Sequence, residues 1–387
     1  MTRWSSSRLK TLGLVAALAL SMPVLAQTQA KGEPLRLPFP YVFSGTLIEF
    51  GERVWNEGML PAVEVINRGG GIKGRPLEFY KVDVRFPETA QWITEFRRLC
   101  ENKDIPIIFG VGPTKSVVAI YEETRKCGIP VFAPSSTGAW SEKDYAGWIF
   151  RYQPTPVDLL PIVLKEGKAR NNLKRIALTY TIDDEYAVFN FKVVQKILKD
   201  LGIEIATEQS IRTKETNFAS QVSAIRAARP DGLMLLHQPS DMGTMLQQLR
   251  ERGVNAQVYG DANVGGADFW RLSNGLAKGS IGYSLYSSND PRPIVQNWVK
   301  LWREKTKRPN DAPDGFVTAY YDAVMVLAHV LNSATALSRE AIRDSFLRVR
   351  DLETISGSII WTAPGEVTRS KPVLVQIGDG GAIKTWP

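Results

Sequence analysis

Two short segments carry residue types that can bind a small anion. Gly110-Val-Gly-Pro-Thr-Lys-Ser116 follows an apolar run and leads into a helical pattern, and Ala133-Pro-Ser-Ser-Thr137 repeats this order further along the chain. Hydroxyl groups and free backbone amides at the start of a helix form a site for a carboxylate. The same hydroxyls can instead cap only their own helices. From the residues alone, both interpretations stay open.

The residue types needed for catalysis form no recognisable set. The two histidines, His237 and His329, fit core or rim positions, because no other residue stands at the spacing that a metal site requires. No Gly-x-Ser-x-Gly nucleophile motif is present. Residues 110–116 lack the glycine directly before the lysine of a phosphate loop, and the glycines of 67–74 end a helix. We therefore predict no catalytic residue, no metal and no cofactor. The chain is not expected to be an enzyme, and a dinucleotide-dependent enzyme is the least favoured alternative.

The N-terminus has the pattern of an export signal. A basic segment is followed by a short apolar run over 12–20 and by small residues up to Ala26. A transmembrane anchor is the alternative, but the run is well short of the roughly 20 residues that a spanning helix needs. We expect cleavage after Ala26, removal of residues 1–26 and a periplasmic location. Cleavage lowers the formal net charge from +8 to +5, and no arginine-rich helix indicates nucleic acid as a partner.

Strand and helix patterns alternate along the rest of the chain and must position the hydroxyl segments. Ile105–Phe109, for example, is fully apolar, as expected for a parallel strand covered on both faces. Two series of such units exceed what one core organises. The predicted fold class is therefore α/β, with two Rossmann-like lobes built on parallel sheets, which bind ligands at the carboxyl ends of their strands. Pro38 and Pro40 fit a central strand poorly, and Pro61 predicts a kink or a late start in the helix over 52–67.

Cys100 and Cys127 are the only cysteines in the sequence. Each stands near the end of a predicted helix, just before a predicted strand, and successive parallel units bring two such ends side by side. In an exported chain this predicts a disulfide, which would stabilise the fold by about 3 kcal/mol. Two unpaired buried thiols are the alternative.

Several segments match a known family in the same order along the chain. They are Phe43-Ser-Gly45, Phe50-Gly51, Glu64–Gly74, Ile107–Gly110, Gly128–Ser135, Arg151 and Asp314–Asp322. In this order they resemble the periplasmic branched-chain amino acid-binding proteins, which have the type I periplasmic binding fold. The resemblance covers essentially the whole mature chain.

The fold implied by this resemblance has three crossovers between two lobes. We expect them near Arg151–Pro156, Tyr283–Ser288 and Ser356–Ile360. Lobe 1 would then combine residues 32–154 with 286–355. Lobe 2 would combine residues 155–285 with 356–387.

The resemblance also implies where the ligand lies. In the family, a hydroxyl residue after the third strand and the loop after the fourth strand hold the ligand carboxylate. The corresponding residues are Thr114, Ser135, Ser136 and Thr137. The glutamate that holds the ammonium of an amino acid corresponds to Ala262, with Asp261 one place away. Because an unpaired buried cation is costly, this departure favours an aromatic or related organic acid first and a branched-chain amino acid second.

The walls of the implied site are mostly aromatic. Phe50, Tyr186 and Phe316 would pack against the ligand, although Phe50 and Phe316 fit an ordinary core as well. Gln238 would add a neutral polar contact from the opposite lobe. The implied function is delivery of a small carboxylate to the membrane permease of an ABC importer, by a monomer that closes through hinge bending. A periplasmic sensor that signals through a receptor is the alternative.

Overall fold

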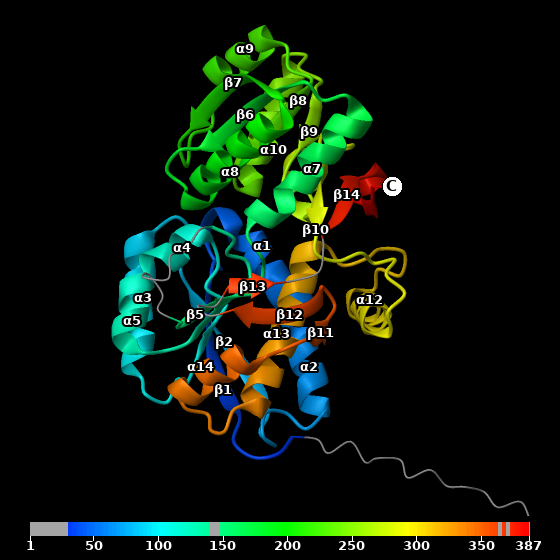
Figure 1. Ribbon diagram of the computed structural model, residues 1–387. Helices are drawn as coiled ribbons and strands as arrows, with labels where there is room; N and C mark the ends of the chain where they lie inside the picture. The colour runs from blue at the N-terminus through cyan, green and yellow to red at the C-terminus, as the bar shows by residue number, and fades with distance from the viewer. Residues whose placement is uncertain (1–29, 139–146, 363–365, 369–371, 387) are drawn as a thin grey trace, which may run out of the picture.

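The computed structural model describes residues 30–138, 147–362, 366–368 and 372–386, and the predicted export signal lies outside these ranges. The molecule has two lobes, one above the other in Figure 1, joined by segments that cross between them. Within the described residues, buried side chains form one core in lobe 1 and one core on each face of the sheet of lobe 2. No described helix is long and apolar enough to cross a membrane.

Parallel strands form the centre of lobe 1, the lower lobe in Figure 1. These strands are β1 (Leu35–Tyr41), β2 (Leu77–Asp83), β3 (Ile108–Phe109), β4 (Val131–Ala133) and β5 (Ile149–Arg151). The helices around them are η1 (Gly45–Leu47), α1 (Ile48–Arg53), η2 (Val54–Met59), α2 (Leu60–Arg68), α3 (Thr89–Glu101), α4 (Thr114–Ala119), α5 (Tyr121–Cys127), α12 (Pro293–Thr306), α13 (Gly315–Ser333) and α14 (Arg339–Arg348). The predicted alternation of strands and helices is thus confirmed.

Two prolines explain why β1 forms a hydrogen-bonded ladder on one side only. The odd-numbered residues of β1 bond to β2; Leu35, for example, donates its N–H to the carbonyl of Pro76. Pro38 and Pro40 face the other side, where β3 lies. Because proline has no N–H to donate, the described parallel strands of lobe 1 form two separate ladders, β1-β2 and β3-β4-β5. Aromatic rings of β1 and β3 pack across this seam with their centroids 6.0 Å apart.

The helix predicted over 52–67 is interrupted. A wider π-helical turn, η2, separates α1 from α2. Pro61 stands in the first turn of α2, where its missing N–H leaves no hydrogen bond unmade. Gly58 in the π turn allows α13 to approach closely, because a Cβ there would lie 2.7 Å from the carbonyl oxygen of Val317. Helical residues thus run from Ile48 through η2 to Arg68, so the predicted late start is wrong, and Pro61 is accommodated directly after the π-helical turn.

Lobe 2 is a single twisted sheet covered by helices on both faces. Its strands are β6 (Arg175–Thr181), β7 (Glu204–Ile211), β8 (Gly232–Leu236), β9 (Gln257–Tyr259), β10 (Ile281–Ser284), β14 (Val373–Ile377) and β15 (Ile383–Thr385). They lie in the order β15-β14-β10-β9-β8-β6-β7. The helices are α7 (Pro156–Asn171), α8 (Glu185–Leu201), α9 (Ala219–Ala228), α10 (Pro239–Glu251), α11 (Ala267–Leu272) and η3 (Asp379–Gly381). The strands β14 and β15 run antiparallel to their neighbours, whereas β6 to β10 are parallel.

The chain returns to lobe 2 later than the sequence predicts. An antiparallel ribbon of β11 (Leu352–Thr354), β12 (Gly357–Thr362) and β13 (Glu366–Thr368) precedes β14. This ribbon belongs to lobe 1: Trp361 is buried in its core and donates its indole N–H to the carbonyl of Arg151 at 2.8 Å. The prediction of a crossover near Ser356–Ile360, with residues from 356 onward in lobe 2, is therefore wrong. The change of lobe occurs between β13 and β14.

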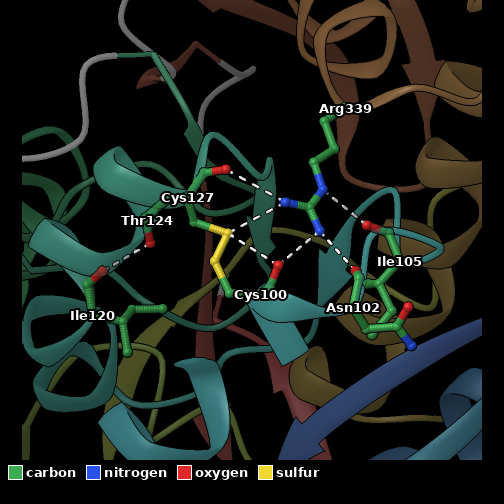
Figure 2. Close-up of a disulfide and its surroundings, with 7 residues drawn as sticks. All are labelled: Cys100, Asn102, Ile105, Ile120, Thr124, Cys127 and Arg339. Atoms are coloured by element: carbon green, nitrogen blue, oxygen red, sulfur yellow. Dashed lines mark hydrogen bonds between the residues drawn. A yellow bond between two sulfur atoms is a disulfide. The ribbon is translucent and has the colours of Figure 1, made fainter. Parts of the chain in front are cut away.

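The predicted disulfide between Cys100 and Cys127 is confirmed, and Figure 2 shows its surroundings. It joins the end of α3 to the end of α5, with the two Cα atoms 6.0 Å apart, a usual separation for such a bond. The buried guanidinium of Arg339, at the start of α14, donates to the carbonyls of Cys100, Asn102 and Ile105 at 2.8–3.1 Å. One cation thus satisfies carbonyl groups that the end of α3 leaves unpaired.

Candidate ligand-binding site

A cavity of about 60 Å³ lies between the lobes. Its walls come from the loops that leave the carboxyl ends of strands in both lobes, which is where parallel sheets bind ligands. Lobe 1 and the segments leading from it contribute Tyr41, Leu47, Phe50, Pro113, Thr114, Ser135, Thr137, Gln153 and Phe316. Lobe 2 contributes Tyr186, Gln238, Pro239, Asp261, Ala262, Asn263 and Tyr283.

The hydroxyl of Thr114 is held in place by the loop after β4. Its oxygen accepts a hydrogen bond from the backbone N–H of Gly138 at 3.1 Å and one from the hydroxyl of Ser136 at 3.3 Å. Gly138 is needed for this approach, because a Cβ there would lie 2.2 Å from the methyl group of Thr114. A hydroxyl accepts two hydrogen bonds and donates one. The proton of Thr114 is therefore available to a ligand in the cavity.

The three predicted residues of the second hydroxyl segment have different positions. Ser136 is fully buried behind Thr114 and does not line the cavity. Ser135 lines it, but its hydroxyl lies 2.9 Å from that of Tyr320, a buried residue of α13. Thr137 lines the cavity and is 7% exposed. Of this predicted segment, Ser135 and Thr137 thus border the cavity, and Ser136 lies behind Thr114.

Phe50 and Phe316 form one apolar wall. Their rings meet edge to face with centroids 5.2 Å apart, and both face the cavity. Behind Phe50, the guanidinium of Arg53 lies 5.6 Å from the centre of its ring. These contacts give the site a rigid aromatic surface that suits the apolar part of a ligand.

Asp261 is a buried carboxylate whose hydrogen bonds come from neutral groups. The hydroxyl of Tyr186 and the amide of Asn190 donate to its Oδ2, and the backbone N–H of Asn263 donates to Oδ1 at 2.9 Å. Burial raises the pKa of Asp261, against the opposing effect of the hydrogen bonds from Tyr186 and Asn263. A carboxylate can accept about four hydrogen bonds, so these three leave room for a further donor in the cavity.

A second layer of contacts fixes the lobe 2 side. Asn263 donates its side-chain amide to the hydroxyl of Tyr186 at 2.8 Å. Asp184 caps α8 by accepting the N–H of Tyr186 at 3.0 Å, and it accepts the amide of Gln238 at 2.9 Å. Burial raises the pKa of Asp184. Gln238 thus uses its amide group on Asp184 and keeps its carbonyl oxygen for other partners.

The cavity carries little charge. Among the described residues that line it, Asp261 is the one with an ionisable acidic group, and none is lysine, arginine or histidine. His237, next to Gln238, is buried between Thr179 and Thr181, and burial lowers its pKa to about 3. It is therefore a neutral core residue. No set of described residues has the composition of a metal site.

Several lining residues were not predicted from the sequence. Asn263 follows Ala262, the position that the resemblance aligns with the family's glutamate, but nothing in the sequence marks Asn263 itself. Gln153 stands in the predicted first crossover, without a motif that marks it. Tyr41 and Tyr283 lie within strands, where an aromatic residue alone indicates only burial. No pattern in the sequence distinguishes these last two from core residues.

Charged contacts join the lobes beside the cavity. Arg53 of α1 pairs both with Asp314, the N-cap of α13 in its own lobe, and with Asp268 at the start of α11 in lobe 2. Burial acts to lower the pKa of Arg53, but the two carboxylates outweigh it and raise the pKa above its usual range. Near Thr114, the ammonium of Lys115 donates to the carbonyl of Asp183 in lobe 2 at 2.5 Å. The structure is therefore that of a closed cleft.

Comparison with known proteins supports one family. A family model described as periplasmic binding protein matches residues 34–382. The leucine-, isoleucine-, valine-, threonine- and alanine-binding protein of Pseudomonas aeruginosa is 22% identical over 359 residues, 92% of each chain. The Leu/Ile/Val-binding protein of Escherichia coli is 23% identical over 355 residues, 91% of this chain and 93% of that protein.

Solved structures show the same fold. A leucine-binding protein from Thermotoga maritima matches with a TM-score of 0.81 at 18% identity, over 91% of this chain and 97% of its own. A branched-chain amino acid transporter substrate-binding protein from Streptococcus pneumoniae, in complex with isoleucine, matches with a TM-score of 0.80 at 19% identity, over 92% of this chain and 100% of its own. At these identities the likeness concerns the fold and not the ligand.

Proposed function

The chain belongs to the periplasmic binding protein family, and from this membership we propose that it is the substrate-binding component of an ABC importer for a small amino acid. The observation that carries the amino acid is Asp261, which lines the cavity, is 2% exposed and is bonded to neutral groups. A buried carboxylate with room for one more donor suits an ammonium group, because a charge-assisted hydrogen bond is stronger than a neutral one.

The proposed ligand orientation places opposite charges at opposite sides of the cavity. The ammonium would contact Asp261 and its carboxylate would accept the free proton of Thr114, with Thr137 beside it. The side chain would lie on Phe50 and Phe316. A zwitterion adds no net charge to the cavity, so neither of its charged groups is buried without a partner.

This proposal reverses the order of ligands favoured by the sequence. An aromatic acid was preferred there because Ala262 occupies the position of the family's ammonium-binding glutamate. Asp261 supplies a carboxylate from the neighbouring position, which supports an amino acid instead. The relatives from P. aeruginosa and E. coli are both named as binding proteins for leucine, isoleucine and valine. Their names therefore support an amino acid as the ligand class. A carboxylate without an amino group is the second candidate, because the raised pKa of Asp261 would let its protonated form donate to a second carboxylate.

The test compares amino acids with the same molecules lacking the amino group, such as leucine and 4-methylpentanoate. Thermal unfolding and isothermal titration calorimetry should show that at least one amino acid binds and that its des-amino analogue does not. Asp261→Asn should weaken amino acid binding by roughly tenfold to a hundredfold, the value of a hydrogen bond to a charged group. Asp200→Asn, an exposed change on α8, is the matched control and should leave affinity unchanged.

The outcomes separate the two candidates. If des-amino carboxylates such as benzoate bind and every amino acid fails, the amino acid assignment falls and the protonated form of Asp261 becomes the better account. If neither class shifts the unfolding temperature, the proposal of a small carboxylate ligand falls as a whole.

Export, partners and oligomeric state complete the proposal. We propose a periplasmic monomer that binds without turnover, is cleaved after Ala26 and docks on a membrane permease when closed. Intact-mass measurement of the exported protein tests the cleavage site, since the chain should then begin at Gln27. Capture of the permease by the liganded form tests the importer, whereas capture of a receptor would favour the sensor.

A further inference from the structure

Gln153 is a buried amide at the junction between the lobes. It follows β5 in the first crossover, where the chain leaves the core of lobe 1 for α7, and its residue is 3% exposed. Its side chain has no hydrogen-bond partner among the described residues, and its amide is not among the fully enclosed polar atoms, so the amide is open to the cavities that Gln153 lines. An amide enclosed by a ligand without a hydrogen bond loses about 1–3 kcal/mol, so a ligand group that bonds to Gln153 is favoured over one that only covers it.

The side chain of Gln153 borders two adjoining cavities. It lines the ligand cavity and also a smaller cavity of about 20 Å³ that shares Ala262, Tyr283 and Phe316 with it. None of the carboxylate-binding hydroxyl residues borders the smaller cavity. The small side chain of Ala262 leaves this branch open beside Gln153. A ligand whose carboxylate lies at Thr114, as proposed above, would reach this branch with its far end.

The described residues that line this branch are uncharged, and Gln153, Tyr283 and Ser284 are the polar ones among them. Phe316 and Ala319 make one side apolar, while Gln153 offers two donors and one acceptor. Tyr283 borders both cavities, and burial together with Asp261 raises the pKa of its hydroxyl, which stays protonated. A purely aliphatic group here would leave the amide of Gln153 unpaired, and a charged group would find no counter-charge.

We propose that Gln153 determines specificity by selecting an amino acid whose side chain carries a neutral hydrogen-bonding group, a hydroxyl or a carboxamide. This inference rests on the proposed function and refines the class of ligand. It makes a polar amino acid a better ligand than its apolar isostere. The polar group gains the hydrogen bonds of Gln153, and the isostere leaves them unmade.

The experiment uses two near-isosteric pairs, threonine with valine and asparagine with leucine, measured by calorimetry on the full mature chain. The wild type should bind the polar member of at least one pair about tenfold more tightly. Gln153→Met removes the amide at nearly constant volume and should bring that ratio close to one, chiefly by weakening the polar member. Gln195→Met, on the outer part of α8 with its amide on Glu208, should keep the wild-type ratio.

The wild-type comparison needs no variant and remains valid if Gln153→Met fails to fold. Preference for valine and leucine over threonine and asparagine would overturn the role of Gln153 and leave the proposed amino acid carrier intact. An unchanged ratio in folded Gln153→Met would overturn it as well. Absence of binding by all four amino acids and by the wider panel would instead overturn the proposed function on which the inference rests.

Discussion

At the scale of single residues, Thr114 shows how a common hydroxyl becomes a specific donor. Two neighbours occupy its acceptor positions, so that its proton is directed elsewhere. Thr114→Ala should lower affinity for the amino acid with the largest thermal shift by about 1.5–3 kcal/mol, as for a hydrogen bond to a charged group. Thr114→Ser, which keeps the hydroxyl, should lose much less. Equal affinities of the wild type and Thr114→Ala in calorimetry would remove this residue from the site.

His237 should make the stability of the protein depend on pH. Its pKa is about 3 in the fold and about 6.5 in an unfolded chain. Between these values the unfolded chain binds a proton that the folded chain does not, so the free energy of unfolding falls as pH falls. Burial raises the pKa of Asp241 to about 6 and also raises that of Asp184 and Asp261, which acts in the opposite direction.

A variant separates the histidine from these carboxylates. His237→Gln retains hydrogen-bonding capacity but does not titrate. Between pH 7 and pH 5, the wild type should lose about 2 kcal/mol of unfolding free energy relative to His237→Gln. Urea unfolding of both proteins at the two pH values measures this difference. Parallel pH profiles would show that the histidine is not responsible.

The structure places at the cavity several residues that the sequence singles out. Thr114, Ser135 and Thr137 stand after predicted strands, and Asp261 stands one place from the position that the resemblance aligns with the family's glutamate. No motif marks Gln153, whose place at two adjoining cavities depends on the fold. Whether a side chain finds a hydrogen-bond partner depends on its neighbours in three dimensions. The position of the residue in the sequence does not reveal those neighbours.

At the scale of elements, the disulfide and Arg339 join three helices. The loop closed by Cys100 and Cys127 spans 27 residues, for which loop entropy gives about 3–4 kcal/mol. Cys100→Ala combined with Cys127→Ala should lower the unfolding free energy by this amount, and the wild type in reductant should show a similar loss. Ligand affinity should stay unchanged, since neither cysteine borders the cavity. Equal stability with and without reductant would contradict the prediction.

The predicted elements are largely present, and the errors have local causes. Short, continuous apolar runs between helical patterns identified the parallel strands. Such runs are expected because the side chains of these strands are covered on both faces. The sequence places β12 and β13 in the wrong lobe, because an antiparallel strand can join either core. Its place is decided by Trp361, which packs on rings of β4, β5 and α14. No periodicity in the sequence indicates which lobe the ribbon packs against.

At the scale of the whole molecule, the ion pairs of Arg53 join the two lobes in the closed arrangement. Asp314 pairs with it inside lobe 1, whereas Asp268 reaches it from lobe 2, so that the second pair requires the closed arrangement. Asp268→Asn should weaken ligand binding by about 1–2 kcal/mol, or roughly 5- to 30-fold, because Arg53 keeps one partner. Calorimetry measures the affinity for the ligand. Small-angle scattering measures the fraction of molecules in the closed arrangement.

The matched control for this prediction is Asp344→Asn. Asp344 pairs with Arg343, its neighbour on α14, so the change removes an ion pair without touching the interface. Affinity should be unaffected by this variant and the molecule should close as before. If both variants bind ligand equally well, Arg53 does not contribute to closure.

The prolines of β1 have a consequence for the nascent chain. A strand that separates from its neighbour exposes a row of donors and acceptors, which can pair with another molecule and start aggregation. Along the edge of β1 that faces β3, Pro38 and Pro40 supply no donors. A partly folded chain in which β3 has not yet docked therefore presents a blunted edge. The same two residues that divide the sheet of lobe 1 protect it from pairing with a second copy.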